Sequence, residues 1–288
     1  SSQWGFSIWM TPKSFLGYAR TQLDTLWVSG EFGPALLGSY HIMKYFAYIP
    51  VIDIIDPATK PLLVELAKVR ENKSSFNFQF ELGFIVTMSV ALPIAGFLYL
   101  YHSTFVALLL GDQWTEYSNI FGVLALLVVA SVFATQARRI LTVFEKVKAI
   151  FYFECTAFVV VYGSLFLIGF DGIYAFTKIR VYLEVVASLS FFVGVTSIYM
   201  GWFYTLKMFF LFVPMLMAVM MSLFVSSMFE FQFILAVNLG LYGLIFTAAY
   251  VLFIMMFYYL LYSKFDSGRH VANLVKEKTN LLINKKRL

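Results

Sequence analysis

Eight long apolar runs alternate with short segments that carry charges, glycines or prolines. A helix that crosses the hydrocarbon core needs about 20 mostly apolar residues, and each run reaches that length. The alternation therefore predicts eight transmembrane helices. Their predicted bounds are residues 13–33, 35–57, 77–101, 116–143, 147–169, 172–202, 205–228 and 232–263.

Composition agrees with this pattern. Hydrophobic residues make up 61% of the chain and charged residues 13%, whereas soluble domains are about 45–50% apolar and about 25% charged. We therefore predict an all-α, polytopic transmembrane helix bundle. The connectors, including residues 56–75 and 102–116, are too short to fold as soluble domains.

The basic residues predict the orientation of the bundle. Sixteen Lys and Arg residues lie in the connectors and helix ends on one side and in the tail, and none lies in the connectors on the other side. Cytoplasmic loops carry the excess of Lys and Arg, so we expect a multi-pass protein of the cell membrane with a cytoplasmic C-terminus. The basic tail, residues 264–288, has apolar residues at near-helical spacing. It is expected either to lie on the anionic inner leaflet or to be solvated and disordered.

The motifs of soluble catalysis are missing. The chain has no phosphate-binding glycine loop and no metalloprotease motif, and its three histidines fall in different regions. The single cysteine, Cys155, excludes an intramolecular disulfide. We predict no enzyme active site, no cofactor, no metal site and no nucleic-acid partner.

Charges inside the predicted helices point to a polar interior. A charge at mid-membrane costs about 2.5–3.5 kcal/mol, so it should face protein or water. In the first helix a polar stripe recurs at three- and four-residue steps. It consists of Gly17, Arg20, Asp24, Trp27 and Glu31. A local Arg20–Asp24 pair would explain two of these residues, but the length of the stripe favours a water-facing wall.

Two other helices contribute cations. In the second, Lys44 has no carboxylate three or four residues away, so its partner is either Asp24 on the adjacent helix or an anionic substrate. His41, Tyr45 and Tyr48 share that helix with Lys44.

In the sixth helix, Arg180 and Glu184 are spaced to pair, and Lys178 is expected to extend toward the outer surface. A self-neutralising pair and a role in a transport pathway both remain open for this helix. The interior leans cationic, which suits a phosphate-bearing substrate better than a cation.

Two stretches resemble polysaccharide-exporting flippases. Residues 20–72, "RTQLDTLWVSGEFGPALLGSYHIMKYFAYIPVIDIIDPATKPLLVELAKVREN", are similar to their seventh and eighth spans, and "LLLGDQWTEYSNIFGVLALL" (108–127) is similar to an outer connector and the next span. The branch is the Wzx-type flippases of the multidrug/oligosaccharidyl-lipid/polysaccharide exporter superfamily. The similarity covers roughly residues 10–200.

The resemblance implies an architecture. Such exporters have two six-helix lobes plus two further helices and are thought to work by alternating access. The chain would then hold the second lobe (1–203), the additional helix pair (204–263) and the cytoplasmic tail (264–288). The first lobe would be missing, either because the chain is a C-terminal fragment or because the other half is encoded separately.

The resemblance also implies a substrate, an oligosaccharide on a polyprenyl pyrophosphate that moves from the inner to the outer leaflet. Membrane lipids and polysaccharide assembly proteins would be its other partners. We expect the pyrophosphate to meet a set of five charged residues, of which only Asp24 matches a position of the family pattern. The set is Arg20, Asp24, Lys44, Lys178 and Arg180.

Three other functions remain open. A cation-coupled drug or metabolite antiporter of the same superfamily would need a net acidic cavity. A membrane glycan polymerase or ligase would need a long polar outer loop, whereas the longest outer connector contains the apolar run "STFVALLL". A scaffold subunit without transport activity is the fourth possibility.

Overall fold

The computed structural model describes residue 18 and residues 22–231 and 233–261. Every regular element within these ranges is helical, and they contain no strand. Six helical stretches are long and apolar enough to cross a membrane. They are Lys73–Leu100, Asp112–Val143, Val147–Leu167, Ile173–Tyr199, Trp202–Ser227 and Leu235–Phe257. The predicted polytopic all-α bundle is thereby confirmed, and these six stretches correspond to the last six of the eight predicted helices.

The second predicted helix does not end where the sequence predicts. Residues 22–32 are helical, and after Gly33 the chain enters α2 (Pro34–Ile49), a π-helical segment η1 (Pro50–Ile55) and α3 (Asp56–Lys68) without a break. Residues 56–68, predicted as connector, are therefore helical. Pro57 lies in the first turn of α3, where proline is tolerated, and α3 continues through Pro61 as well, so the sequence "DPATKP" does not end the helix. The first predicted helix begins outside the described residues.

The remaining elements follow in order. They are α4 (Lys73–Leu100), α5 (His102–Leu110), the 3₁₀-helix η2 (Asp112–Tyr117), α6 (Ser118–Ala125), α7 (Leu127–Val143), α8 (Val147–Leu167), α9 (Ile173–Tyr199), α10 (Trp202–Ser227) and α11 (Leu235–Leu261). The predicted outer connector 102–116 thus contains a short helix. At the start of α4 the Asn72 side chain accepts hydrogen bonds from the backbone N–H groups of Ser74 and Ser75.

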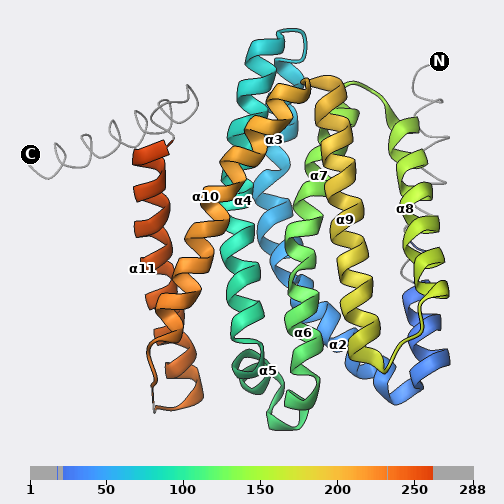
Figure 1. Cartoon of the computed structure of the whole chain (residues 1–288), viewed down its shortest axis with the longest axis vertical. Coiled ribbons are helices and arrows are strands. Elements are labelled where there is room, and N and C mark those ends of the chain that lie inside the picture. Colours follow the sequence, from blue (N-terminus) through green and yellow to red (C-terminus); the bar gives the residue numbers. More distant parts are fainter. Residues whose placement is uncertain (1–17, 19–21, 232, 262–288) are drawn as a thin grey trace, which may run out of the picture.

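The long helices run side by side, with α4 and the continuous α6–α7 rod in the middle (Figure 1). In the most apolar 18 residues of the Asp112–Val143 stretch, 83% are buried inside the bundle. The corresponding share in α11, at the edge of the bundle, is 17%. Two apolar clusters fill the interior, one around Phe84, Phe133 and Phe192, the other around Phe121 and Phe176. A helix with most of its surface exposed in an apolar chain is suited to lie against lipid.

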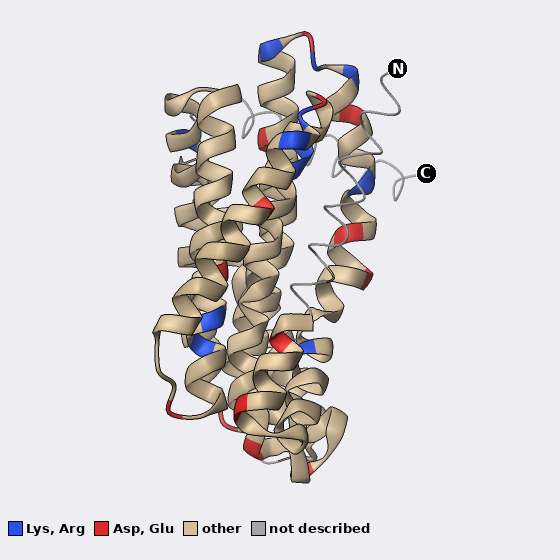
Figure 2. Cartoon of the chain, turned by 90° about the vertical axis from the view of Figure 1, so that its right-hand side faces the viewer, with Lys and Arg blue, Asp and Glu red and all other residues tan. Residues whose placement is uncertain are grey.

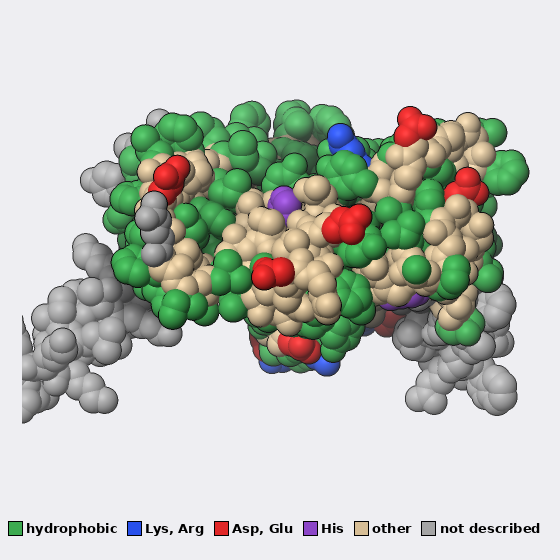
Figure 3. Space-filling view, turned by 90° about the horizontal axis from the view of Figure 1, so that it is seen from below, with side chains coloured by type: hydrophobic (Ala, Val, Ile, Leu, Met, Phe, Trp, Pro, Cys, Tyr) green, Lys and Arg blue, Asp and Glu red, His purple; other side chains and the backbone are tan. Residues whose placement is uncertain are grey.

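Charge is unevenly distributed between the two ends of the bundle. Lys and Arg gather near the end that carries the α3–α4 and α7–α8 turns (Figure 2). The opposite face shows several Asp and Glu side chains among apolar ones and very few cationic ones (Figure 3). The turns of the acidic end hold Glu31, Asp112, Glu116, Asp171 and Glu230. The two ends of the bundle thus differ in charge in the way from which the sequence predicts a cytoplasmic basic end.

Helix α10 packs closely on α4 at a glycine. A Cβ atom built on Gly96 would lie 2.7 Å from Cγ1 of Val219. Small residues let membrane helices approach closely, and packing is a main source of their association. An ion pair also joins α10 to α4. Nζ of Lys207 lies 2.7 Å from Oε2 of the buried Glu81.

Replacement of Gly96 by leucine should therefore destabilise the protein by about 1–3 kcal/mol, because the added side chain forces α10 away from α4. Thermal unfolding of the detergent-solubilised protein measures the effect. Gly163→Leu is the matched control, since nothing lies within 4 Å of a Cβ built there. Adding Val219→Ala should restore part of the stability lost in Gly96→Leu. Equal stability of the two leucine variants would contradict this view of the contact.

Candidate functional site

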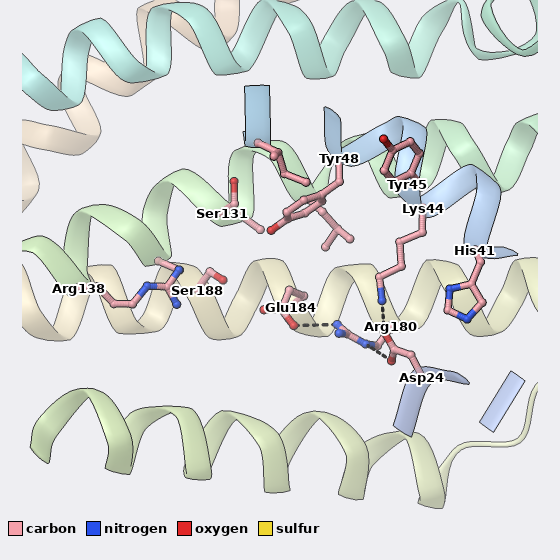
Figure 4. Close-up of a pocket in the computed structure, with 14 residues that line it drawn as sticks. Asp24, His41, Lys44, Tyr45, Tyr48, Ser131, Arg138, Arg180, Glu184 and Ser188 are labelled. Carbon is pink, nitrogen blue, oxygen red and sulfur yellow. Dashed lines mark hydrogen bonds and ion pairs between the residues drawn. The ribbon is translucent and has the colours of Figure 1, made fainter. Parts of the chain in front are cut away.

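A cavity of about 510 Å³ opens between the helix of residues 22–32, the α2–η1 stretch, α7 and α9 (Figure 4). Its wall combines charged and hydroxyl-bearing side chains with small apolar ones. The lining residues are Asp24, His41, Lys44, Tyr45, Tyr48, Ile52, Leu127, Ala130, Ser131, Ala134, Arg138, Arg180, Glu184 and Ser188. The π-helical segment contributes Ile52, and π-turns inside helices often occur at functional sites.

The Asp24 carboxylate holds the wall together. Its side chain is 1% exposed, and Nζ of Lys44 lies 2.7 Å from Oδ2. Nε of Arg180 donates to Oδ1 at 3.1 Å, and the Tyr162 hydroxyl donates to the same oxygen at 2.7 Å. One carboxylate therefore joins α2, α8 and α9 to the helix that bears it. The sequence named Asp24 as one of two candidate partners of Lys44, and the structure confirms that contact.

Arg180 has a second acidic partner. Its Nη1 donates to Oε2 of Glu184 at 2.7 Å. The sequence predicted that these two residues can pair, because they are four positions apart on one helix. The guanidinium also lies over the Tyr162 ring, with Cζ 5.5 Å from the ring centroid. Two carboxylates and an aromatic face thus hold this cation in a fixed orientation at the cavity wall.

Exposure decides which charges a ligand would meet. The side chains of Lys44 and Arg138 are 25% and 31% exposed, whereas those of Asp24 and Arg180 are 1% and 8% exposed. Glu184 lies between, at 17%. The accessible surface of the cavity is therefore biased toward positive charge, although each of these cations has an acidic partner. Such a surface attracts anions, and in a low-dielectric surrounding the attraction is stronger than in water.

Not all of the predicted binding residues meet in this cavity. Asp24, Lys44 and Arg180 do. Lys178 is exposed, outside the lining, with Nζ 5.9 Å from the centroid of the Tyr182 ring. Arg20 lies outside the described residues, as does Gly17.

The polar stripe of the first helix does not form a continuous wall in the part that the structure describes. Of the stripe residues that the structure describes, only Asp24 lines the cavity. Trp27 packs against aromatic rings of the α8–α9 region instead, stacked on Phe176 with ring centroids 6.2 Å apart and edge-on to Phe166 and Phe170. Glu31 is exposed at the end of the helix.

Sequence reasoning did not single out several residues of the site, among them Tyr162 and Arg138. Tyr162, a neutral residue in an apolar helix, gives no signal that it contacts Asp24. Arg138 was assigned to the basic cytoplasmic side, although it lies inside the predicted helix 116–143. Among the described residues no group of three or more His, Cys, Asp or Glu side chains could hold a metal ion. The cations at the cavity wall are suited to holding an anion.

Comparisons with known proteins concern the first part of the chain. The family described as "Polysaccharide biosynthesis protein" matches residues 2–119. The lipopolysaccharide biosynthesis protein WzxC of Escherichia coli (strain K12) is 27% identical over 124 residues, which are 43% of this chain and 25% of that relative. No solved structure matches. The resemblance to Wzx-type proteins is thereby confirmed, and the matched part spans only a quarter of the relative's length.

We expect the substitution Asp24→Asn to cost about 3–5 kcal/mol of stability, because it leaves the buried Arg180 and its neighbour Lys44 without their shared carboxylate. Thermal or denaturant unfolding of the purified protein measures the loss. The control is Glu65→Gln, since the Glu65–Lys68 pair is 53% and 61% exposed; it should change stability by less than about 1 kcal/mol. If the two variants were equally stable, Asp24 would not be the centre of the wall.

Proposed function

We propose that this chain forms part of an exporter that moves an oligosaccharide linked to a polyprenyl diphosphate from the inner to the outer leaflet by alternating access. One observation carries the proposal. Lys44 and Arg180, from distant parts of the sequence, converge on Asp24 at the wall of one charged cavity. The similarity to a polysaccharide biosynthesis family and to WzxC supports the substrate class.

The cavity would hold the diphosphate by partner exchange. A diphosphate carries several negative charges and many acceptor oxygens, so it competes with Asp24 and Glu184 for Lys44 and Arg180. Bonds between a guanidinium and phosphate are strong and directional. Asp24 retains the Tyr162 hydroxyl as a donor when the cations turn to the ligand. No bond of the substrate is made or broken in this cycle, so we propose a transporter and not an enzyme.

The same geometry weighs against the other function classes. A cation-coupled antiporter needs a carboxylate ready to bind a cation, but Lys44, Arg180 and Tyr162 already engage Asp24. A membrane glycan polymerase or ligase needs polar catalytic groups outside the bilayer, and the α5 helix in the longest outer connector is apolar, with the sequence "HSTFVALLL". Both remain less supported than export.

Architecture and location complete the proposal. We propose that the chain lies in the cell membrane. Residues 1–203 form a six-helix lobe of the exporter, residues 204–263 form an additional helix pair, and residues 264–288 form a cytoplasmic tail. A partner lobe would face the cavity from the other side of the pathway. Polysaccharide assembly proteins would supply the lipid-linked glycan and receive it.

Substitution of Lys44 by Gln at the chromosomal gene should cause lipid-linked glycan precursors to accumulate on the inner leaflet, because the cavity loses the more exposed of the two cations beside Asp24. We expect at least about a tenfold loss of export, the effect of one charge-assisted contact. Pulse-labelling of precursor and surface polysaccharide measures it. Lys178→Gln is the matched control, since that lysine is exposed outside the cavity and should leave export unchanged. Normal export in Lys44→Gln would overturn the proposal.

The proposed orientation has its own test in a Cys155→Ser background, which removes the one native thiol. A cysteine at Asp171, in the acidic-side turn, should react with a membrane-impermeant maleimide in intact spheroplasts, since that turn would face outward. A cysteine at Glu71, in the α3–α4 turn, should react only after lysis. The opposite labelling pattern would place the C-terminus outside.

A further inference from the structure

A third cation, Arg138, lines the cavity away from the Asp24 cluster, which holds Lys44 and Arg180. Figure 4 shows Arg138 at one end of the lining, near Ser188, with Lys44, Asp24 and His41 toward the other end. Arg138 pairs with Glu154, whereas Asp24 accepts from Tyr162, and these two α8 residues are eight positions apart, which is about 12 Å along the helix. The two cationic positions are therefore farther apart than the two phosphates of one diphosphate group.

Arg138 is held less tightly than Arg180. Its Nη1 donates to Oε1 of Glu154 on α8 at 2.7 Å, and its Nη2 contacts Oγ1 of Thr135 at 3.4 Å. The Arg138 side chain is 31% exposed, and Glu154 does not line the cavity. Glu154 thus approaches Arg138 from behind the wall, and the accessible part of the guanidinium faces the hollow.

The surface between the two cationic positions suits a polar chain. Ser131 and Ser188 offer hydroxyl groups, and Tyr45 and Tyr48 offer rings with polar tips. Leu127, Ala130 and Ala134 leave room in the wall by their modest size and bring no competing charge. Among the described lining residues, Glu184 is the carboxylate between Arg138 and the Asp24 cluster (Figure 4), so an anionic group that moves from one to the other meets no further carboxylate of this set.

We propose that Arg138 is a separate anion-binding position at the inner end of the cavity, where the diphosphate headgroup docks before it reaches Lys44 and Arg180. This inference rests on the proposed function and adds a specific residue and order to it. The headgroup displaces Glu154 from Arg138, and Glu154 remains nearby as the competing partner. Arg138 is thus the first contact of a substrate that enters from the basic end of the bundle.

A role in binding and a purely structural role make opposite predictions for the two partners. If Arg138 binds the headgroup, Arg138→Gln weakens binding by about tenfold, whereas Glu154→Gln removes the competitor and strengthens binding by about threefold. If the pair only clamps α7 to α8, both substitutions break the same clamp and have the same sign.

The test measures the affinity of farnesyl diphosphate for the purified protein in lipid nanodiscs, with uncharged farnesol to subtract partition of the prenyl chain. Arg138→Lys, which keeps the charge but loses the forked donors of the guanidinium, should bind with an affinity between those of the unmodified protein and Arg138→Gln. Unchanged or weaker binding in Glu154→Gln overturns the inference. That variant decides alone if Arg138→Gln does not fold, as judged by thermal unfolding.

The result also separates this inference from the function on which it rests. No binding of farnesyl diphosphate beyond that of farnesol in the unmodified protein would overturn the proposed function. If binding were lost in Lys44→Gln but unchanged in Arg138→Gln and Glu154→Gln, only the proposed role of Arg138 would be overturned.

Discussion

A carboxylate buried in an apolar bundle dictates the rest of this site. Ionised Asp24, 1% exposed, can be kept in such a place only with opposite charge and hydrogen-bond donors around it. Those donors come from Lys44 on α2, Tyr162 on α8 and Arg180 on α9. Four helical segments are thus positioned by one side chain. Long cationic side chains that converge on a point cannot also fill the space between their helices, so a polar hollow remains beside them.

Other charges in the bundle serve packing. Glu81 on α4 accepts from Lys207 and from the Tyr204 hydroxyl, both near the start of α10. Together with the close contact at Gly96 they fix α10 against the centre of the bundle. A larger cavity of about 680 Å³, between α4, the α2–η1 stretch and α11, is lined by Pro50, Phe97, Phe246 and other residues without formal charge. An anion gains no contact with a positive charge there, so of these two cavities the Asp24 cavity is the one suited to a phosphate.

The all-α class could be predicted from the amino-acid sequence, and so could three residues that line the cavity, Asp24, Lys44 and Arg180. Polar groups are costly to place in hydrocarbon, so long apolar runs indicate membrane helices and charges within those runs indicate a polar interior. Spacing within one helix predicted that Arg180 and Glu184 can pair, and the adjacency of two helices made Asp24 one of two candidate partners of Lys44. Tyr162 and the Arg138–Glu154 pair depend on how α8 packs, which no local pattern encodes. The helical course of residues 56–68 was missed because prolines were read as breaks. Lys178, two residues from Arg180, faces away from the cavity, as a 100° turn per residue requires.

The acidic partners of these cations have a physical purpose if the cavity carries a diphosphate. Bare Lys and Arg in a low-dielectric site would bind several negative charges so tightly that release would be slow. Asp24 and Glu154 compete with the ligand, so each captured charge costs an ion pair and the net affinity stays moderate. A ligand can shift the equilibrium between two states of a transporter only by as much as its affinities for those states differ. Small shifts of α8 or α9 change how well Asp24 and Glu154 reach their cations. The competing carboxylates therefore convert helix movement into a change of affinity, which is what alternating access demands of a binding site.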